Sequence, residues 1–596
     1  MSSVPEREEI PEEYRWDLES VYATDEDWEH AYERAESKVE ELARYEDADL
    51  SDGETLLEVL ELRDEVMRLV SKVSSYASMR SDEDLRDQHY QALSARASSL
   101  VSEASSAASF IDPAVQSLSR DELEETIEET DGLEVYDHYL DDVIRMKDHT
   151  RSAEVEALLS DLGEVLGAPS DTYGKLTNAD LTFPTVERPD GEAVEITQSN
   201  FTKLLKHEDR EFREEVYDAY YGTLSDVRNT VGTTLKHSVK TDVKLARARD
   251  YDSAREAALD GPNIPVEVYD NLVDTVEANV DVLHRHADLK REALDVDTLE
   301  MWDLYMPLVG DEKPEVDYEE AKDHIVEAVA PLGEDYQQRV AQGLEDRWVD
   351  VYESRGKRSG AYSGGAYDTQ PFILMNYQED IESMFTLAHE LGHSLHSQLT
   401  SEHQPYVYSN YEIFVAEVAS TVNETLLTHH LLETVEDETF RRHVLNEYLE
   451  RFRSTLFRQT LFADFEHRVH ELAEEGEALT PDVFDETYRD RKELYYEPAN
   501  VDDTIAREWM RIPHFYYNFY VYQYATGISA AVALVQDILD EGEPAAERYV
   551  DFLQSGATDY PLELLRSAGV DMRSPEPVER AIEVYDDYLD EMNALL

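Results

Sequence analysis

Three residues within five positions, His389, Glu390 and His393, could build a hydrolytic metal centre. On a helix, positions four apart lie on one face about one turn apart, so both imidazoles can reach one ion. Glu390 points to the side, where it can touch a water at the metal without being a ligand. Two neutral nitrogen ligands, an open coordination position and a general base are the requirements of a zinc peptidase. The alternative is a core helix that happens to carry two histidines.

The segment around this motif is predicted to be a helix with one buried side. Asp380 is the expected N-cap. His396 lies along the face of the motif, but it is two turns from His389 and too far to share an ion with both motif histidines. We expect it to be structural or to support the ligands. The apolar residues that recur at helical spacing are Met384, Leu387, Ala388, Leu391 and Leu395.

A second helix is predicted over residues 411–424, and it could supply the third ligand. Carboxylates on so apolar a helix are costly unless they are paired or bound to a metal. Glu417 and Glu424 are seven positions apart and share a face, so either could be the ligand and the other its supporting partner. Helical geometry does not choose between them. The chain has no cysteine, so a zinc site here must use His, Asp and Glu.

Two further stretches could handle a substrate. Residues 360–371 form a Gly/Ser/Tyr-rich loop that leads into a short apolar strand over 372–377. An edge strand beside a metal site can pair with an extended peptide, although a plain hairpin that supports the helix fits equally well. Residues 514–524 hold one histidine and five tyrosines. They could form a wall that stabilises an oxyanion, or they could simply pack in the core.

The rest of the chain must position these residues, and most of it is predicted to be helical. Helical patterns run from about Trp16 to Asp148 and resume near Ser199. Residues 183–197 alternate around Asp190-Gly191, which predicts a β-hairpin. We expect a mainly α protein in two parts: a helical N-terminal lobe over residues 1–200 that includes the hairpin, and a catalytic region over residues 201–596.

The charge of the chain is extreme. Lysine and arginine number 53 against 135 aspartates and glutamates, for a formal net charge of −82 over 596 residues. This charge is spread along the whole chain, and a hydrated acidic surface suits a protein dissolved in molar salt. We therefore expect a cytoplasmic protein from an organism with a salt-rich cytosol; an ordinary acidic protein is the alternative. With no basic stripe to neutralise phosphates, nucleic acid is not an expected partner.

The beginning of the chain, Met-Ser-Ser-Val-Pro-Glu-Arg-Glu-Glu, lacks the apolar run of a signal peptide. No stretch is long enough to span a membrane. We expect a soluble protein that is not exported and has no membrane partner. A monomer is compatible with the sequence, which leaves the oligomeric state open.

Several stretches together resemble one known family, the oligoendopeptidase F group of the M3 (thimet oligopeptidase-like) zinc metallopeptidases. The resemblance covers most of the chain, because the motifs follow in the same order from near the start to near the end. They are Tyr14-Arg-Trp-Asp-Leu, Arg358-Ser-Gly-Ala-Tyr-Ser, His389-Glu-Leu-Gly-His-Ser, Phe414-Val-Ala-Glu-Val-Ala-Ser, Arg458-Gln-Thr-Leu-Phe-Ala-Asp-Phe-Glu, Ile512-Pro-His-Phe-Tyr, Tyr520-Val-Tyr-Gln-Tyr-Ala-Thr-Gly and Ser567-Ala-Gly-Val-Asp.

The resemblance implies a mainly helical, two-lobed ellipsoid with a deep substrate channel and a small β-sheet next to the zinc-motif helix. It implies one Zn²⁺ per chain, held by His389, His393 and Glu417, with Glu390 as the base and Glu424 as a supporting group. His514, Tyr517 and Tyr524 match positions that contact the substrate and the tetrahedral intermediate. The match at Tyr517 is the loosest, because the spacing there varies across the wider family.

The expected function is therefore zinc-dependent hydrolysis of internal bonds in short to medium oligopeptides. The alternatives are a peptidyl-dipeptidase or another HExxH hydrolase, or a peptide-binding protein without activity. The sequence has no GxSxG elbow for a serine hydrolase, and without cysteine a thiol protease is excluded.

Overall fold

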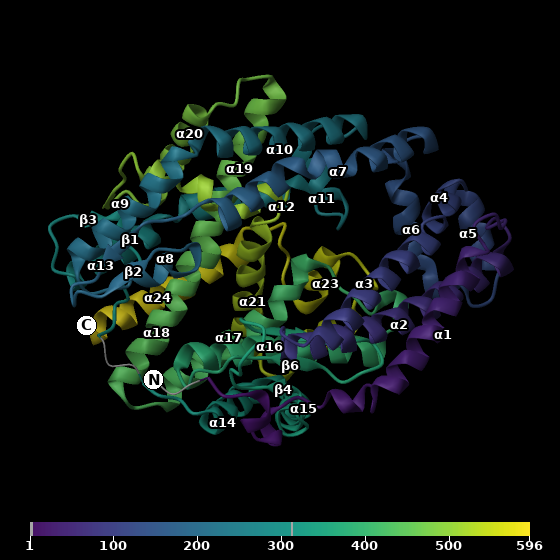
Figure 1. Ribbon diagram of the computed structural model, residues 1–596, viewed down its shortest axis with the longest axis horizontal. Helices are drawn as coiled ribbons and strands as arrows, with labels where there is room; N and C mark the ends of the chain where they lie inside the picture. The colour runs from purple at the N-terminus through teal and green to yellow at the C-terminus, as the bar shows by residue number, and fades with distance from the viewer. Residues whose placement is uncertain (1–3, 311–313) are drawn as a thin grey trace. The chain divides into compact units, whose positions relative to one another are not determined.

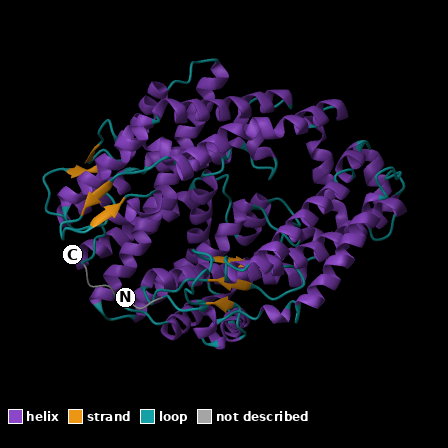
Figure 2. Cartoon of the chain, viewed as in Figure 1, coloured by secondary structure: helices purple, strands orange, loops and turns teal. Residues whose placement is uncertain are grey.

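The computed structural model describes residues 4–310 and 314–596 and is mainly α-helical, as predicted. The strands are few and short (Figures 1 and 2). By contacts, the described residues divide into two compact units, each assembled from three separate stretches of the chain. The first unit comprises residues 4–147, 314–434 and 534–570, and the second comprises residues 148–310, 435–533 and 571–596. The division into residues 1–200 and 201–596 follows chain order instead and stays a prediction.

The first unit is a set of helices around a small sheet. Its helices are α1 (Asp25–Ala43), α2 (Gly53–Glu83), α3 (Gln88–Ala108), α4 (Ile111–Gln116), α5 (Arg120–Glu129), α6 (Asp137–Arg145), α14 (Tyr318–Ala328), α15 (Glu334–Glu345), α16 (Ile381–His403), α17 (Ile413–Thr434), α22 (Glu543–Ser555) and α23 (Pro561–Ala568). Its strands are β4 (Val349–Asp350), β5 (Tyr362–Gly364) and β6 (Phe372–Leu374).

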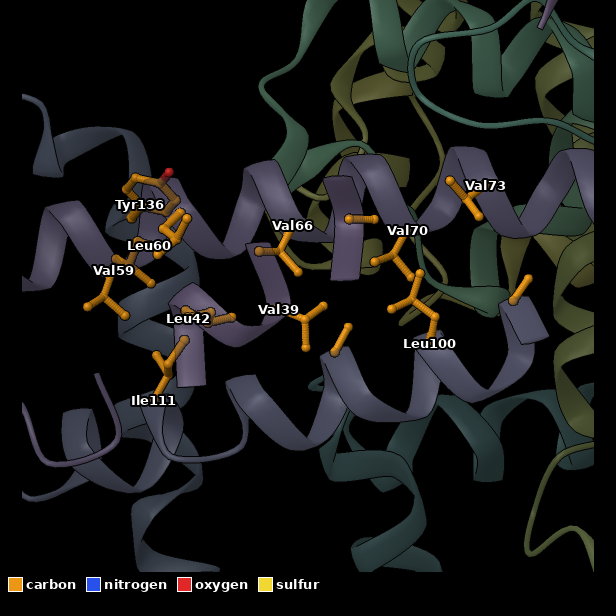
Figure 3. Close-up of a cluster of buried hydrophobic side chains, with 14 of the residues drawn as sticks. Val39, Leu42, Val59, Leu60, Val66, Val70, Val73, Leu100, Ile111 and Tyr136 are labelled. Atoms are coloured by element: carbon orange, nitrogen blue, oxygen red, sulfur yellow. The ribbon is translucent and has the colours of Figure 1, made fainter. Parts of the chain in front are cut away.

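The N-terminal helices of this unit form around a continuous apolar core. Asp52 caps α2 by accepting a hydrogen bond from the backbone N–H of Thr55, and the helix then presents apolar residues at helical spacing. These residues meet α1 and α3 in one buried cluster (Figure 3). Full burial of each large aliphatic side chain contributes about 1.5–3 kcal/mol. The labelled members of the cluster are Val39, Leu42, Val59, Leu60, Val66, Val70, Val73, Leu100, Ile111 and Tyr136.

The sheet of the first unit lies against the helix that carries the HExxH motif. Its strand order is β4-β6-β5, with β6 parallel to β4 and antiparallel to β5. The apolar strand expected over residues 372–377 is present but ends at Leu374, and of the two interpretations that the sequence left open, the supporting strand is the one found. Because β6 is fully buried between two neighbours, it supports the helix, and the edge strands are β4 and β5.

The second unit is also helical. Its helices are α7 (Ala153–Lys175), α8 (Gln198–Leu204), α9 (Arg210–Asp226), α10 (Arg228–Ala248), α11 (Ala254–Asp260), α12 (Val266–Ala278), α13 (Asp281–Ala293), α18 (Glu438–Phe452), α19 (Arg458–Glu475), α20 (Pro481–Tyr495) and α24 (Glu576–Leu595). Its strands are β1 (Thr185–Glu187), β2 (Ala193–Glu195), β3 (Leu299–Glu300) and β7 (Ala499–Asn500). The predicted hairpin is β1–β2, which pair antiparallel.

A buried ion cluster fixes the segment that leads to the tyrosine-rich stretch of the second unit. Glu508 lies in the 3-10 helix η11 (Ile505–Arg511) and accepts hydrogen bonds from Arg458, Tyr488 and Lys492. Burial alone would raise the pKa of Glu508, but the facing cations hold it well below its usual value. The next turn, η12 (Pro513–Tyr516), and the start of α21 (Tyr522–Glu541) carry the histidine and most of the tyrosines.

The helices that the structure describes are each too short or too polar to cross a lipid bilayer.

Candidate metal centre

Helix α16 begins where the sequence predicts and carries the whole HExxH motif. Asp380 Oδ1 accepts a hydrogen bond of 2.8 Å from the backbone N–H of Ser383, which is the predicted N-cap. The predicted apolar face is buried from Met384 to Leu395. Since the helix is capped and packed along this face, His389 and His393 have fixed directions.

The second helix, α17, packs closely against α16, and a glycine makes the approach possible. A Cβ atom at Gly392 would lie 2.6 Å from the carbonyl oxygen of Ala419 and 2.6 Å from Cα of Ser420. Gly392 is not among the site residues predicted from the sequence, although the sequence carries a signal for it. Glycine in a helix interior costs about 1 kcal/mol relative to alanine, so its presence between the two histidines indicates a packing requirement.

The structure brings His389, His393 and Glu417 together. Nε2 of His389 lies 3.1 Å from Nε2 of His393, and Oε2 of Glu417 lies 3.5 Å from the first nitrogen and 3.8 Å from the second. A tetrahedral ion with ligand bonds of about 2.1 Å would separate its ligand atoms by roughly 3.4 Å. The three atoms therefore have the spacing of one metal-binding face, and two imidazoles with a carboxylate are a donor set that suits zinc.

The two glutamates that the sequence left as alternatives occupy different places. Glu417 faces Nε2 of both histidines, whereas Oε1 of Glu424 lies 2.8 Å from Nδ1 of His389. Glu424 is only 1% exposed. A buried carboxylate at Nδ1 favours the tautomer whose Nε2 lone pair is free to bind a metal. His393 is oriented in the same way by a hydrogen bond to the backbone of Ala416.

The pKa shifts of His393 and Glu390 favour the roles expected of them, metal ligand and proton carrier. Burial and the neighbouring His389 lower the pKa of His393 to about 4, so its imidazole is neutral at neutral pH and keeps a lone pair for a metal. Burial raises the pKa of Glu390, with a further contribution from Glu417, while His389 and a hydrogen bond from the backbone of Ser363 oppose the shift. A carboxyl whose pKa is raised towards neutrality is a better proton carrier than an exposed one.

His396 is not part of the cluster, as expected. Its ring is buried and stacked on Tyr411, with centroids 3.7 Å apart and planes 6° from parallel. Burial lowers its pKa to about 3, so it packs as a neutral aromatic residue.

His514, Tyr517 and Tyr524 belong to the second unit, where they lie in one aromatic group. The ring of His514 is 5.6 Å from that of Tyr517 and 6.2 Å from that of Tyr524. Tyr517 is 53% exposed. Burial lowers the pKa of His514, and Arg458 lowers it further. The three residues are thus neighbours of one another, and their roles toward the metal centre stay a prediction.

Comparison with known proteins places the chain in a peptidase family. A family model described as Peptidase family M3 matches residues 203–584, and one described as Oligopeptidase F matches residues 115–183. The chain is 47% identical to Oligopeptidase PepF of Bacillus subtilis over 596 residues, which cover 100% of this chain and 89% of that protein.

Solved structures give the same result. The crystal structure of oligoendopeptidase-F from Enterococcus faecium superposes with a TM-score of 0.75 at 37% identity, covering 96% of this chain and 99% of the other. That of a candidate peptidase from Chlamydophila abortus superposes with a TM-score of 0.92 at 32% identity over 100% of both chains.

Proposed function

The chain belongs to peptidase family M3 and is a peptidase, and from this premise we propose that it is a zinc-dependent endopeptidase acting on oligopeptides. The observation that carries the proposal is the group formed by His389, His393 and Glu417, with the carboxyl of Glu390 beside it on α16. The names of the relatives, oligopeptidase and oligoendopeptidase, support the choice of substrate.

The residues that would hold the ion are His389 and His393 through Nε2, and Glu417 through Oε2. When bound, zinc supplies Lewis acidity, which polarises a scissile carbonyl and makes a water easier to deprotonate. Glu424 accepts a hydrogen bond from the N–H at Nδ1 of His389 and so keeps that imidazole in the ligating tautomer.

Glu390 moves the proton. Its carboxylate takes a proton from the attacking water as the new C–O bond forms, and holds it as a carboxylic acid. It then gives the proton to the amide nitrogen as the C–N bond breaks, so that an amine leaves and Glu390 is ionised again. Its buried position beside Ser363 supports this role, because burial raises the pKa of the Glu390 carboxyl above that of an exposed one and makes it the better proton carrier.

The edge strand β5 would align the peptide. Its inner edge pairs with β6, and the backbone of Ser363 on this strand contacts Glu390. An extended peptide added to the outer edge would have its backbone fixed beside the general base. We further propose that His514 and Tyr524 stabilise the developing oxyanion and that Tyr517 contacts the substrate. These three roles rest on the sequence resemblance.

We also propose that the protein acts in a salt-rich cytoplasm. Its net charge of −82 supports this, because high salt screens the repulsion among the many carboxylates.

The test is cleavage of internally quenched oligopeptides, with products mapped by mass spectrometry, before and after treatment with a chelator. We expect internal cleavage that is lost on chelation and restored by zinc. Release of dipeptides alone from the C-terminus would identify a peptidyl-dipeptidase instead. Cleavage that persists in the zinc-free protein would contradict the proposal.

A further inference from the structure

A cavity of about 370 Å³ lies within the first unit, and the helix that carries the metal-site histidines passes along it. Its walls come from α16, the turn between β5 and β6, the segment 406–411 that precedes α17, and Ser71 of α2. Pockets that hold small ligands have volumes of about 300–1,000 Å³, so this space is far larger than a void for one or two waters.

The cavity begins one helical turn from the candidate metal centre. His389, His393, Ser397 and Ser401 are spaced four residues apart and form one stripe along α16, and both serines line the cavity. One turn of helix is about 5.4 Å. On the other wall, Gly364 lines the cavity and directly follows Ser363, whose backbone contacts Glu390. A side chain next to a bond held at Glu390 would therefore reach this space.

The lining is uncharged, although the chain is strongly acidic. In a chain with 135 acidic residues among 596, the lining residues are Ser, Thr, Tyr, Gln, Asn, Gly, Ala and Pro, and none of them carries a charge. A charged side chain that entered would lose water without meeting a charged lining residue, and Arg68 and Asp368 beside Tyr367 are already paired with each other, so its burial would be costly. Rings of Tyr367, Tyr406 and Tyr411 supply apolar faces and hydroxyl groups instead.

Two amides in the wall have unused hydrogen-bonding capacity. Oε1 of Gln398 and Nε2 of Gln370 are buried and have no hydrogen-bond partner in the part of the chain that the structure describes. Buried polar atoms are nearly always paired in folded proteins. Both side chains belong to the wall of the cavity, and these two atoms are not held by hydrogen bonds, so a small rotation of either amide group would present it to a ligand.

We propose that this cavity is a specificity subsite that binds one uncharged, hydrogen-bonding side chain of the peptide substrate, such as Gln, Asn or Tyr, next to the cleaved bond. The inference rests on the proposed function, which it deepens. The amides of Gln398 and Gln370 recognise the side-chain amide or hydroxyl group, the tyrosine rings pack against its carbon atoms, and the uncharged lining rejects Lys, Arg, Asp and Glu.

The experiment is a set of peptides of equal length in which one residue at a time, on either side of the cleaved bond, is Gln, Tyr, Lys or Glu. We expect kcat/KM at one position to be at least about tenfold higher for Gln and Tyr than for Lys and Glu, a difference of about 1.4 kcal/mol. Binding of the same peptides, followed by fluorescence anisotropy, gives a second measure that does not depend on turnover.

Two variants test the assignment to this cavity. Gln398→Glu introduces a carboxylate, and it should raise the preference for Lys over Gln at that position by at least about tenfold. Ser401→Asp introduces one on the next turn of the stripe and should act in the same direction. The matched control is Gln88→Glu, an exposed site at the start of α3, which adds the same charge and should leave every preference unchanged.

If neither Gln398→Glu nor Ser401→Asp changes the side-chain preference in cleavage or in binding, the subsite is overturned, while zinc-dependent cleavage by the same proteins would leave the proposed function intact. If the wild type cleaves none of the peptides, the proposed function fails, and the anisotropy series still decides whether the cavity selects a side chain.

Discussion

At the level of single residues, the different positions of Glu417 and Glu424 are the point that helical spacing could not predict and that only the family resemblance indicated. Both lie on one face of α17, and a separation of seven residues makes them equivalent in any helical pattern. They differ only in the nitrogen atom they face: Nε2 of both histidines for Glu417, and Nδ1 of His389 for Glu424. That difference depends on the distance and rotation between two helices, which local periodicity does not contain. The HExxH spacing, in contrast, predicted the positions on α16 directly.

Glu390→Gln tests the proton carrier. The amide keeps the size of the side chain but cannot accept a proton, so kcat should fall by about 10²–10⁴-fold. Zinc content, measured by mass spectrometry of the metal, should stay at that of the wild type. Glu382→Gln, an exposed change on the same helix, is the control and should retain full activity. Near-normal turnover by the Glu390 variant would show that Glu390 is not the general base.

At the level of elements, the approach of α16 to α17 determines whether the cluster can form, and a single glycine permits it. The sequence predicted both helices, but it did not predict their spacing. The same holds for the small sheet of the first unit: the sequence predicted a strand but not its neighbours. Periodicity predicted an apolar strand near Phe372, but its neighbours are fixed by partners 24 and 10 positions earlier, as in the pairs Val349–Ile373 and Ser363–Ile373. Periodicity could not decide whether this strand lies at an edge or inside the sheet, because pairing order is a tertiary property.

Gly392→Ala tests the helix approach. The added methyl group would meet the backbone at Ala419 and Ser420, which cannot rotate away, so the variant should lose about 1–3 kcal/mol of stability and bind zinc more weakly. Gly167→Ala is the matched control, because Gly167 lies in helix α7 with open space around it. That change should stabilise the protein by about 0.4–1 kcal/mol. Equal unfolding temperatures for the two variants would show that the close contact is unimportant.

Glu466 of α19 gives the second unit a predicted pH dependence. Burial raises the pKa of Glu466 to about 7, against the opposing influence of His470. Its Oε1 accepts the backbone N–H of Phe519, a residue with φ of 57° beside Asn518 with φ of 46°. In the unfolded chain Glu466 loses its proton near its ordinary pKa of 4.5, whereas in the folded protein it loses it near pH 7. Between these two pH values the folded state therefore binds more protons than the unfolded state. The contribution of Glu466 to stability therefore falls as pH rises from about 4.5 to about 7.

Glu466→Gln keeps an acceptor for Phe519 and removes the titration. The free energy of unfolding of the variant minus that of the wild type should therefore be larger at about pH 8 than at about pH 5. The increase should be up to about 3 kcal/mol. Thermal unfolding at both pH values measures this, with the exposed Glu475→Gln as a control that should show no such change. A difference between variant and wild type that is the same at both pH values would contradict the shifted titration.

At the level of the whole molecule, hydrophobic periodicity predicted the mainly α class and the long helices, but local patterns could not predict how the chain folds back on itself. Each compact unit is built from three separated stretches, and the contacts that join them are long-range. The polar cluster around Glu508 is another such feature: Arg458, Tyr488 and Lys492 are 50, 20 and 16 positions away along the chain. The spacing of charged residues along the chain does not predict that these four side chains contact one another in the core.

The net charge of −82 makes a prediction about salt. The distance over which like charges repel one another falls from about 10 Å at 0.1 M salt to about 3 Å at 1 M salt. Because the carboxylates are closer together in the folded state than in the unfolded chain, the folded state should gain stability as salt is added. The unfolding temperature should rise by more than about 10 °C between about 0.1 M and about 3 M KCl. Sucrose at matched osmolality, which cannot screen charge, should give a smaller rise. If KCl and sucrose act equally, or neither acts, charge repulsion is not what limits stability.

The central claim is that side chains from α16 and α17 form one metal site, and the most direct test is the zinc affinity of single variants measured by competition with a chromophoric chelator. We predict one tight site in the wild type, a loss of more than about 100-fold for Glu417→Gln and a loss of about 10–100-fold for Glu424→Gln. Glu433→Gln, an exposed change on α17, should bind zinc as the wild type does. Wild-type affinity in the Glu417 variant, or no stoichiometric site in any of the proteins, would contradict the account.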